Sequence, residues 1–590
     1  MKLKEVYSKT KMFVVIIAFI IIFKSVFGDE NTLIGVTIVT ALLMLLQRDL
    51  TANLFKFFIV FSLINVGQGI LAYMTNWNPY IGIPATFISM FVTGYLFTYN
   101  LKSPLFVGFG LQYLFMLYVP VSYDDLPTRL LSLFVGAIII VASQLIFNRN
   151  RLTKSSMGIL PGIVSSLGDK IDSIIEGKYN LHDDASVVAL IRALRKEVNE
   201  SRESYFHTTI EGKINLNLTI GLERGAILLD RICFNNNGER IEITEFTKEL
   251  LIRLKECISL ITVNINNKPN IENCVNKIQE FINDYSIKIN DLEEGEFKNN
   301  LNEILENMDF IHHNLKEILE VDYSKYKGYV RKTSIPENFK TSYVLRNNFK
   351  LKSVKLSYAL RSAIVITISV FMVNYFNIVD GKWIVFTVFA IIQPYEHQGT
   401  NKSKKRLFGT IIGIAVFIVC FSIIKDNTIR SMIIMLSGYI STYQNKYERE
   451  MICITFSALG VAALAGGVST IIALHRGLYV ILGIGIGILS NKIILPYRIE
   501  DGNRDLVNIY NQIINLAKEE IDNAANGRGN IQNMRNLIMY TSFIEERLSI
   551  NMSDLDNNER DNITKELRSN RILINDLYDE YLGVYSKSSK

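Results

Sequence analysis

The sequence has few cysteines and none of the motifs that mark the commonest enzyme sites. Its 590 residues include five cysteines, and no two of them form a C-x-x-C pair, so we expect neither disulfides nor a metal knuckle. It contains no Walker sequence G-x-x-x-x-G-K-[ST], no H-E-x-x-H and no nucleophile elbow. These absences argue against ATP as the direct energy source and against an enzyme, and we predict no cofactor and no metal ion.

Histidine is also scarce, with six in the whole chain. Only His312 and His313 are adjacent. Because neighbours on a helix point about 100° apart, we expect these two rings to share no ligand face and to lie on a solvated helix surface.

Apolar residues are abundant instead. They make up 49% of the chain, and the mean hydropathy is +0.21. Between Met12 and Phe147, and again between Leu356 and Pro496, they form runs of about 16 to 22 residues, which as helix cross roughly 30 Å of hydrocarbon. We therefore predict an all-α polytopic membrane protein. No small-residue cleavage site follows the first run, so we expect it to be a retained first helix and not a signal peptide.

We predict twelve membrane spans in two sets of six. The first set lies near residues 12–27, 31–46, 54–74, 80–99, 104–121 and 129–147. The second set lies near residues 356–376, 381–395, 407–424, 428–444, 450–470 and 475–496. Lys and Arg gather on alternate loops, whereas Asp29, Glu30, Asp124 and Asp125 occupy the others. The positive-inside rule then places both termini and the long polar segments in the cytoplasm of a cell whose plasma or inner membrane holds the chain.

The two sets read as copies of one segment. TRLLSLFVGAIIIVASQLIFNRNR at 128–151 matches HRGLYVILGIGIGILSNKIILPYR at 475–498 without a gap, and KIDSIIEGKYN at 170–180 matches EIDNAANGRGN at 520–530. The identical pairs include Arg129 with Arg476, Gly136 with Gly483, Ser143 with Ser490, Asp172 with Asp522 and Gly177 with Gly527. We infer a duplication whose halves share one orientation, and transporters built this way commonly bind substrate near the repeat interface.

This duplication predicts four domains. They are a six-span repeat at 1–147, a cytoplasmic helical domain at 148–352, a second six-span repeat at 353–497 and a cytoplasmic helical tail at 498–590. In the polar segments, apolar residues recur at three- and four-residue steps, as at Leu250, Leu254 and Ile258, so we expect bundles of amphipathic helices there.

The stretch GKWIVFTVFAIIQPYEHQGTNKSKKRLFGTIIG at 381–413 joins a helix end to a basic group. Pro394 removes a backbone donor, so the span ends near Gln393 and leaves carbonyls that need partners, or else Pro394 lies at the interface and merely ends the helix. The basic group is Lys402, Lys404, Lys405 and Arg406. We expect it in a cytoplasmic loop as a topology anchor, with attraction of anions as an added role.

Small and charged residues within the spans are the next signals. We assign to helix packing the small-xxx-small pairs Gly409 with Gly413 and Gly483 with Gly487. Arg361, Arg129 and Arg476 are costly in a membrane: each either binds a carboxylate through its planar fork, or snorkels or caps a neighbouring helix. Trp383 stacks an aromatic ring or belongs to an interfacial aromatic belt.

Acidic residues are missing from the middle of the spans. The nearest proton-coupling candidates lie toward the predicted cytoplasmic end, and they are Glu396, His397 and Glu450.

At these residues the sequence resembles the fusaric acid resistance (FUSC) and aromatic acid exporter superfamily. The resemblance is carried by GKW at 381–383, Thr387, Gln393-Pro394, the R-x-x-G-T-x-x-G at 406–413 and Arg361, and it is strongest over 356–498. In the N-terminal half Thr37 corresponds to Thr387, but Leu43 and Met44 stand where Gln393 and Pro394 would be. The resemblance implies export of aromatic carboxylic acids or related organic anions and drugs, driven by the proton gradient.

We therefore expect a secondary exporter that works by alternating access. The expected substrate-binding residues are Arg361, Trp383, Thr387, Gln393, Arg406, Arg129 and Arg476. The alternatives are an anion channel or facilitator, and a membrane scaffold whose cytoplasmic bundles recruit a partner. The expected partners are an organic-anion substrate and the lipid bilayer, and no nucleic acid. A second copy of the chain and a periplasmic adaptor, which completes the pump in some relatives, stay open.

Overall fold

The structure is a computed structural model. It describes residues 3–98, 105–180, 184–202, 209–234, 240–261, 268–320, 346, 348–351, 353–464, 469–552 and 557–588. In this part of the chain every named element is a helix, and the only strand-like contact is an isolated bridge between Phe234 and Arg240. The all-α prediction is confirmed.

The chain divides into two compact units, which are described separately. Unit 1 comprises Met1–Arg48, Leu54–Ile146 and Thr341–Gly502. Unit 2 comprises Asp49–Asn53, Phe147–Lys340 and Asn503–Lys590. The finer division into four domains stays a prediction.

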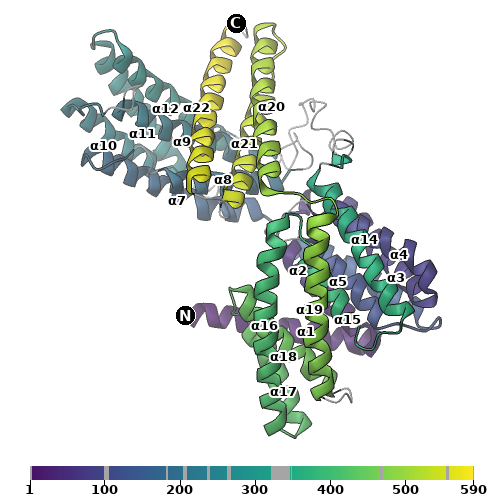
Figure 1. Ribbon diagram of the computed structural model, residues 1–590. Coiled ribbons are helices and arrows are strands. Elements are labelled where there is room, and N and C mark those ends of the chain that lie inside the picture. Colours follow the sequence, from purple (N-terminus) through teal and green to yellow (C-terminus); the bar gives the residue numbers. More distant parts are fainter. Residues whose placement is uncertain are drawn as a thin grey trace. The chain divides into compact units, whose positions relative to one another are not determined.

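Unit 1 has one helix at each of the predicted spans (Figure 1). The helices are α1 (Leu3–Phe27), α2 (Thr32–Leu45), α3 (Leu54–Trp77), α4 (Pro79–Phe97), α5 (Leu105–Tyr118), α6 (Leu126–Phe147), α14 (Val354–Tyr375), α15 (Lys382–Ile391), α16 (Glu396–Ile423), α17 (Asn427–Ser441), α18 (Tyr447–Leu464) and α19 (Ser469–Ile493). Among the described residues, seven helices are long and apolar enough to cross a membrane, namely α1, α3, α4, α6, α14, α16 and α19. The chain is thus a helical membrane protein, and the count of twelve crossings remains a prediction.

The basic group at 402–406 lies on a helix, and not in the predicted loop. Helix α16 already begins at Glu396, because Gly399, Ser403 and Arg406 continue the buried face that Gly409 and Gly413 form deeper in the helix. As a result the group is split between two faces. Lys404 and Lys405 are exposed, whereas Lys402 is half-buried and Arg406 is buried. Only Lys404 and Lys405 are exposed as expected for residues that act solely as a topology anchor.

The two halves of unit 1 pack closely against each other. The backbone at Gly94 in α4 approaches α14 so closely that an added Cβ would lie 3.0 Å from the Cα of Ala359. The rings of Phe106 and Tyr358 lie 4.8 Å apart. At these two contacts the halves pack directly against each other, at the repeat interface near which we had expected substrate to bind.

Unit 2 is a set of amphipathic helices. Its helices are α7 (Arg151–Ile175), α8 (Ala185–Glu200), α9 (Ile210–Cys233), α10 (Glu245–Ser259), α11 (Lys268–Asn290), α12 (Glu296–Glu320), α20 (Ile499–Ala525), α21 (Ile531–Asn551) and α22 (Asn557–Ser588). Leu250, Leu254 and Ile258, which the sequence pattern placed on one helix face, are all buried in one core cluster. The amphipathic pattern was therefore interpreted correctly.

Matched residues of the two similar segments adopt matched geometry. Gly177 after α7 has φ +73°, and Gly527 after α20 has φ +70°, a left-handed conformation that glycine adopts without strain at a helix end. In unit 1, Gln144 Nε2 donates to the Leu45 carbonyl at 3.0 Å, and Asn491 Nδ2 donates to the Ile391 carbonyl at 2.9 Å. The duplication of the whole chain stays a prediction.

Candidate functional site

Arg361 caps the broken end of α15. It is fully buried, with a relative exposure of 0%, and its Nη2 donates to the carbonyls of Gln393 and Pro394 at 2.5 and 2.9 Å. Its Nη1 donates to the Leu495 carbonyl at 2.8 Å. The carbonyls of Gln393 and Pro394 lie just beyond the end of α15, and that of Leu495 lies just beyond the end of α19, where backbone carbonyls lack helical partners. Arg361 therefore stabilises the non-helical segment between α15 and α16. Gln393 contacts Arg361 through its backbone carbonyl.

Arg129 plays a similar capping role in the N-terminal half. Its Nε donates to Asn31 Oδ1 at 3.0 Å, its Nη1 to the Val119 carbonyl at 2.6 Å and its Nη2 to the Glu30 carbonyl at 2.9 Å. Every guanidinium nitrogen has a partner. Arg129 lies on α6, apart from the other predicted site residues, and each of its three guanidinium nitrogens already donates to an oxygen of the chain.

Arg476, at the matched position on α19, has a different environment. It is 2% exposed, and its guanidinium carbon lies 4.1 Å from the centroid of the Trp383 ring. Its Nη2 donates to Thr455 Oγ1 at 3.4 Å, whereas Nε and Nη1 have no partner. Among the described residues no carboxylate forms an ion pair with it. A buried cation without a counter-charge costs several kcal/mol, of which a cation–π contact returns about 2 kcal/mol.

Thr387 on α15 and Thr455 on α18 each pack against a glycine of a neighbouring helix. A Cβ built on Gly483 of α19 would lie 2.7 Å from the Cβ of Thr387, and one built on Gly413 of α16 would lie 2.7 Å from the Cβ of Thr455. Each glycine thus lets a threonine-bearing helix, α15 or α18, approach closely. The Thr387 hydroxyl is buried without a partner, as is the hydroxyl of Thr410 beside Gly409. Like Arg476, Thr387 and Thr410 therefore have buried polar atoms without hydrogen-bond partners.

Arg406 brings a second guanidinium into these helices. Its Nη1 donates to Tyr447 Oη at 3.2 Å, and its Nε is buried without a partner. It lies close enough to Arg476 for the two positive charges to repel each other. Lys402, one turn earlier on α16, places its Nζ 5.3 Å from the centre of the Tyr447 ring.

The proton-coupling candidates are spread over two places. Glu396 begins α16, and its backbone N–H donates to the Tyr497 carbonyl at 3.1 Å. The His397 ring lies 6.1 Å from the Tyr395 ring. Glu450 lies in the first turn of α18, near enough to Lys402 to attract its charge. None of the three contacts Arg476.

Sequence reasoning missed Thr455, Tyr447 and the contact of His475 with Asp380, whose Nδ1 and Oδ2 are 2.9 Å apart. It included Thr410 only as part of the R-x-x-G-T-x-x-G motif and gave it no role. A signal for Thr455 exists, since M-x-x-x-T at 451–455 parallels W-x-x-x-T at 383–387. The pairing of His475 with Asp380 joins residues far apart in the sequence, and no local pattern points to it.

The polar cluster thus lies within the C-terminal half of unit 1. Helices α15, α16, α18 and α19 bring together Trp383, Thr387, Arg406 and Arg476, and they leave out Arg129, Arg361 and Gln393. The cluster is cationic, holds unpaired donors and includes an aromatic ring, which are the groups that bind a planar organic anion.

Residues 367–490 match the family model described as "Fusaric acid resistance protein-like". This segment covers about a fifth of the chain and holds all four residues of the cluster. The match confirms the resemblance seen in the sequence over this segment. No curated protein and no solved structure matches the chain.

Proposed function

We propose that this membrane protein, which carries a FUSC-like segment, is a secondary exporter of aromatic carboxylic acids or related organic anions. The family match and the apolar helices indicate a membrane transport protein of the efflux type. The observation that supports an anionic substrate is Arg476, a buried guanidinium with two unpaired nitrogens and no carboxylate partner.

In this proposal the substrate supplies the missing counter-charge. Its carboxylate accepts hydrogen bonds from Arg476 and the Thr387 hydroxyl, and Trp383 provides a flat apolar contact beside them. Arg406 adds a second positive charge near Arg476 that attracts the anion. Arg361 and Gln393 shape the site indirectly, because they hold the break between α15 and α16 in place.

Coupling to protons belongs to the same proposal. Glu396, His397 and Glu450 are the candidates, and Glu450 faces the cation Lys402. The charge of the bound anion and the protonation of a carboxylate near Lys402 would then be linked, because both change the charge around one group of cations.

The test is transport of labelled hydroxybenzoate by sealed vesicles that contain the purified chain. We expect movement that requires an imposed pH gradient, disappears with an uncoupler and is lost with Arg476→Gln. Flux that depends on Arg476 but ignores the pH gradient would contradict proton coupling and indicate a passive anion pathway. Flux that is the same with Arg476→Gln as with the natural chain would contradict the proposed site.

A further inference from the structure

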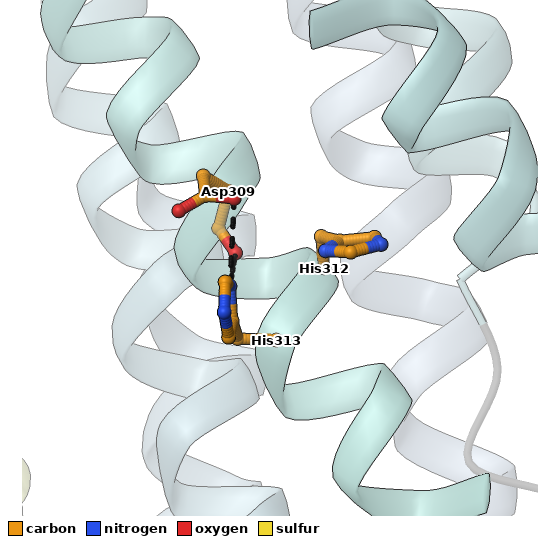
Figure 2. Close-up of side chains that lie close together, drawn as sticks. All are labelled: Asp309, His312 and His313. Atoms are coloured by element: carbon orange, nitrogen blue, oxygen red, sulfur yellow. Dashed lines mark hydrogen bonds and ion pairs between the residues drawn. The ribbon is translucent and has the colours of Figure 1, made fainter.

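Unit 2 contains three metal-ligating side chains close together on α12. These are Asp309, His312 and His313, and one ligand atom from each lies within 4.8 Å of the others. Figure 2 shows Asp309 and His313 facing each other across one helical turn, whereas the His312 ring extends from the helix in another direction. The prediction that both histidines lie on a solvated helix surface is wrong for His312, which is buried. The prediction that they share no ligand face considered only the directions in which the residues leave the helix. The rings extend beyond the Cβ atoms, so their nitrogens approach each other.

Asp309 and His313 form the outer part of the group. His313 Nδ1 lies 3.4 Å from Asp309 Oδ1 and 3.2 Å from the Asp309 carbonyl oxygen. Their side chains are 52% and 72% exposed, so solvent reaches the open side. A carboxylate and an imidazole at positions i and i+4 of a helix form a chelating pair, because this spacing brings both side chains to one face.

His312 forms the inner part. It is 7% exposed, and its Nδ1 has no hydrogen-bond partner. A neutral imidazole keeps a lone pair on one ring nitrogen, which can bind a metal ion. A buried nitrogen that lacks a partner destabilises the fold, and a metal ion would supply that partner.

We propose that Asp309, His312 and His313 bind one divalent transition-metal ion. Two imidazole nitrogens and one carboxylate oxygen suit Zn²⁺, Co²⁺ or Ni²⁺ better than Mg²⁺ or Ca²⁺, which prefer oxygen ligands alone. Bonds of about 2.0–2.1 Å in a tetrahedral site place ligand atoms roughly 3.3 Å apart. The Asp309–His313 pair already has this spacing. The widest separation must shorten by roughly 1.5 Å, which concerted rotations of the exposed Asp309 and His313 side chains supply, and water completes the coordination.

The experiment uses the full chain, purified in detergent with its affinity tag removed. Co²⁺ binding is followed by visible absorption, and Zn²⁺ binding by calorimetry. We expect one equivalent of each ion to bind, and affinity to fall at least tenfold with His313→Ala and with His312→Gln. Glu306→Gln, one turn earlier on the same helix and outside the group, should bind like the natural chain.

Failure of the natural chain to bind either ion at micromolar concentration would overturn the proposal. Equal binding by His313→Ala and the natural chain would also overturn it. Because His313 is exposed, this variant gives the answer even if His312→Gln is poorly folded. A near-ultraviolet band from cobalt bound to thiolate would place the ion on a cysteine, and this result too would count against the site.

Discussion

Arg476 and Trp383 form a close cation–aromatic contact, with the guanidinium carbon 4.1 Å from the ring centroid. Arg129, at the matched position of the similar segment, instead places all three guanidinium nitrogens on backbone or amide oxygens. At these matched positions Arg129 thus donates to oxygens at helix ends, whereas Arg476 has two guanidinium nitrogens without a partner. This difference locates the candidate anion site in the C-terminal half.

The first prediction compares these two arginines. Arg476→Gln should fold and reach the membrane fraction but reduce anion affinity by roughly 10- to 100-fold, since a hydrogen bond to a charged group contributes about 1.5–3 kcal/mol. Arg129→Gln should instead reduce yield and thermal stability, because it leaves the carbonyls of Glu30 and Val119 without donors. Vesicle transport and detergent thermostability measure the two effects. The opposite pattern would show that the roles are reversed.

The second prediction concerns two glycines on α19. A Cβ on Gly483 would meet Thr387 Cβ at 2.7 Å and the Ile384 carbonyl oxygen at 2.9 Å, whereas one on Gly485 would meet nothing within 4 Å. We expect Gly483→Ala to destabilise unit 1 by about 1–3 kcal/mol through overpacking and Gly485→Ala to be close to neutral. Thermal midpoints by fluorescence-detected size exclusion compare them. Equal midpoints would mean that α15 and α19 do not pack as described.

The third prediction concerns Arg361 and a second capping arginine. Arg430 donates to the carbonyls of Ile424 and Phe421 at 2.8 and 3.0 Å, but it is only half-buried. Water can replace Arg430 and cannot replace the fully buried Arg361. Arg361→Ala should therefore lower the thermal midpoint far more than Arg430→Ala, since an orphaned buried carbonyl costs roughly 1–3 kcal/mol. A larger loss with Arg430→Ala would contradict this account.

The fourth prediction is a pH dependence of unit 2. Burial raises the pKa of the Asp579 carboxyl to about 6, although Arg224 Nε lies 3.0 Å from its Oδ1. Between pH 3.8, its pKa in the unfolded chain, and about pH 6, the Asp579 carboxyl is therefore protonated in the folded state and ionised in the unfolded state. The resulting stabilisation is complete below 3.8 and disappears as the pH rises through 6. Relative to Asp579→Asn, the natural side chain should lose about 1–3 kcal/mol of stability over this window.

The measurement uses the buried thiols of unit 2 as reporters of its unfolding. Cys233, Cys257 and Cys274 are buried in its core, and burial raises the pKa of all three thiols, so they react with a maleimide dye only after unfolding. Cys420→Ala and Cys453→Ala remove the thiols of unit 1. The unfolding temperatures of the chain with Asp579 and of Asp579→Asn are compared at pH 4.5 and pH 7. An identical change in unfolding temperature for both would show that Asp579 titrates normally.

The sequence predicted the helices well, because the signal for each is local. Apolar runs placed every helix of unit 1, and the three- and four-residue recurrence placed the buried face of α10. The break at Gln393-Pro394 was also predictable, since proline cannot donate a backbone hydrogen bond. Arg361 was predicted as a site residue or a cap, and the structure shows the cap.

The partners of the polar residues were not predictable from the sequence. Whether a buried arginine meets a carbonyl, as Arg129 does, or an aromatic face, as Arg476 does, depends on helices that are distant in the chain. The basic group at 402–406 was placed in a loop because four cations there suggest solvent. The helix continues through it, since helical spacing sends Lys404 and Lys405 outward and Arg406 inward. Likewise, adjacency alone did not reveal that His312 and His313 approach Asp309 together.

The most direct test of the central claim is binding of a carboxylate beside Trp383. The chain has two tryptophans, so Trp77→Phe leaves Trp383 as the sole reporter, with Arg476 against its ring. Titration with benzoate should change the fluorescence saturably, and its neutral analogue benzamide should not. The benzoate response should disappear with Arg476→Gln. Equal responses to benzoate and benzamide, or a benzoate response that survives Arg476→Gln, would contradict an anion site at this arginine.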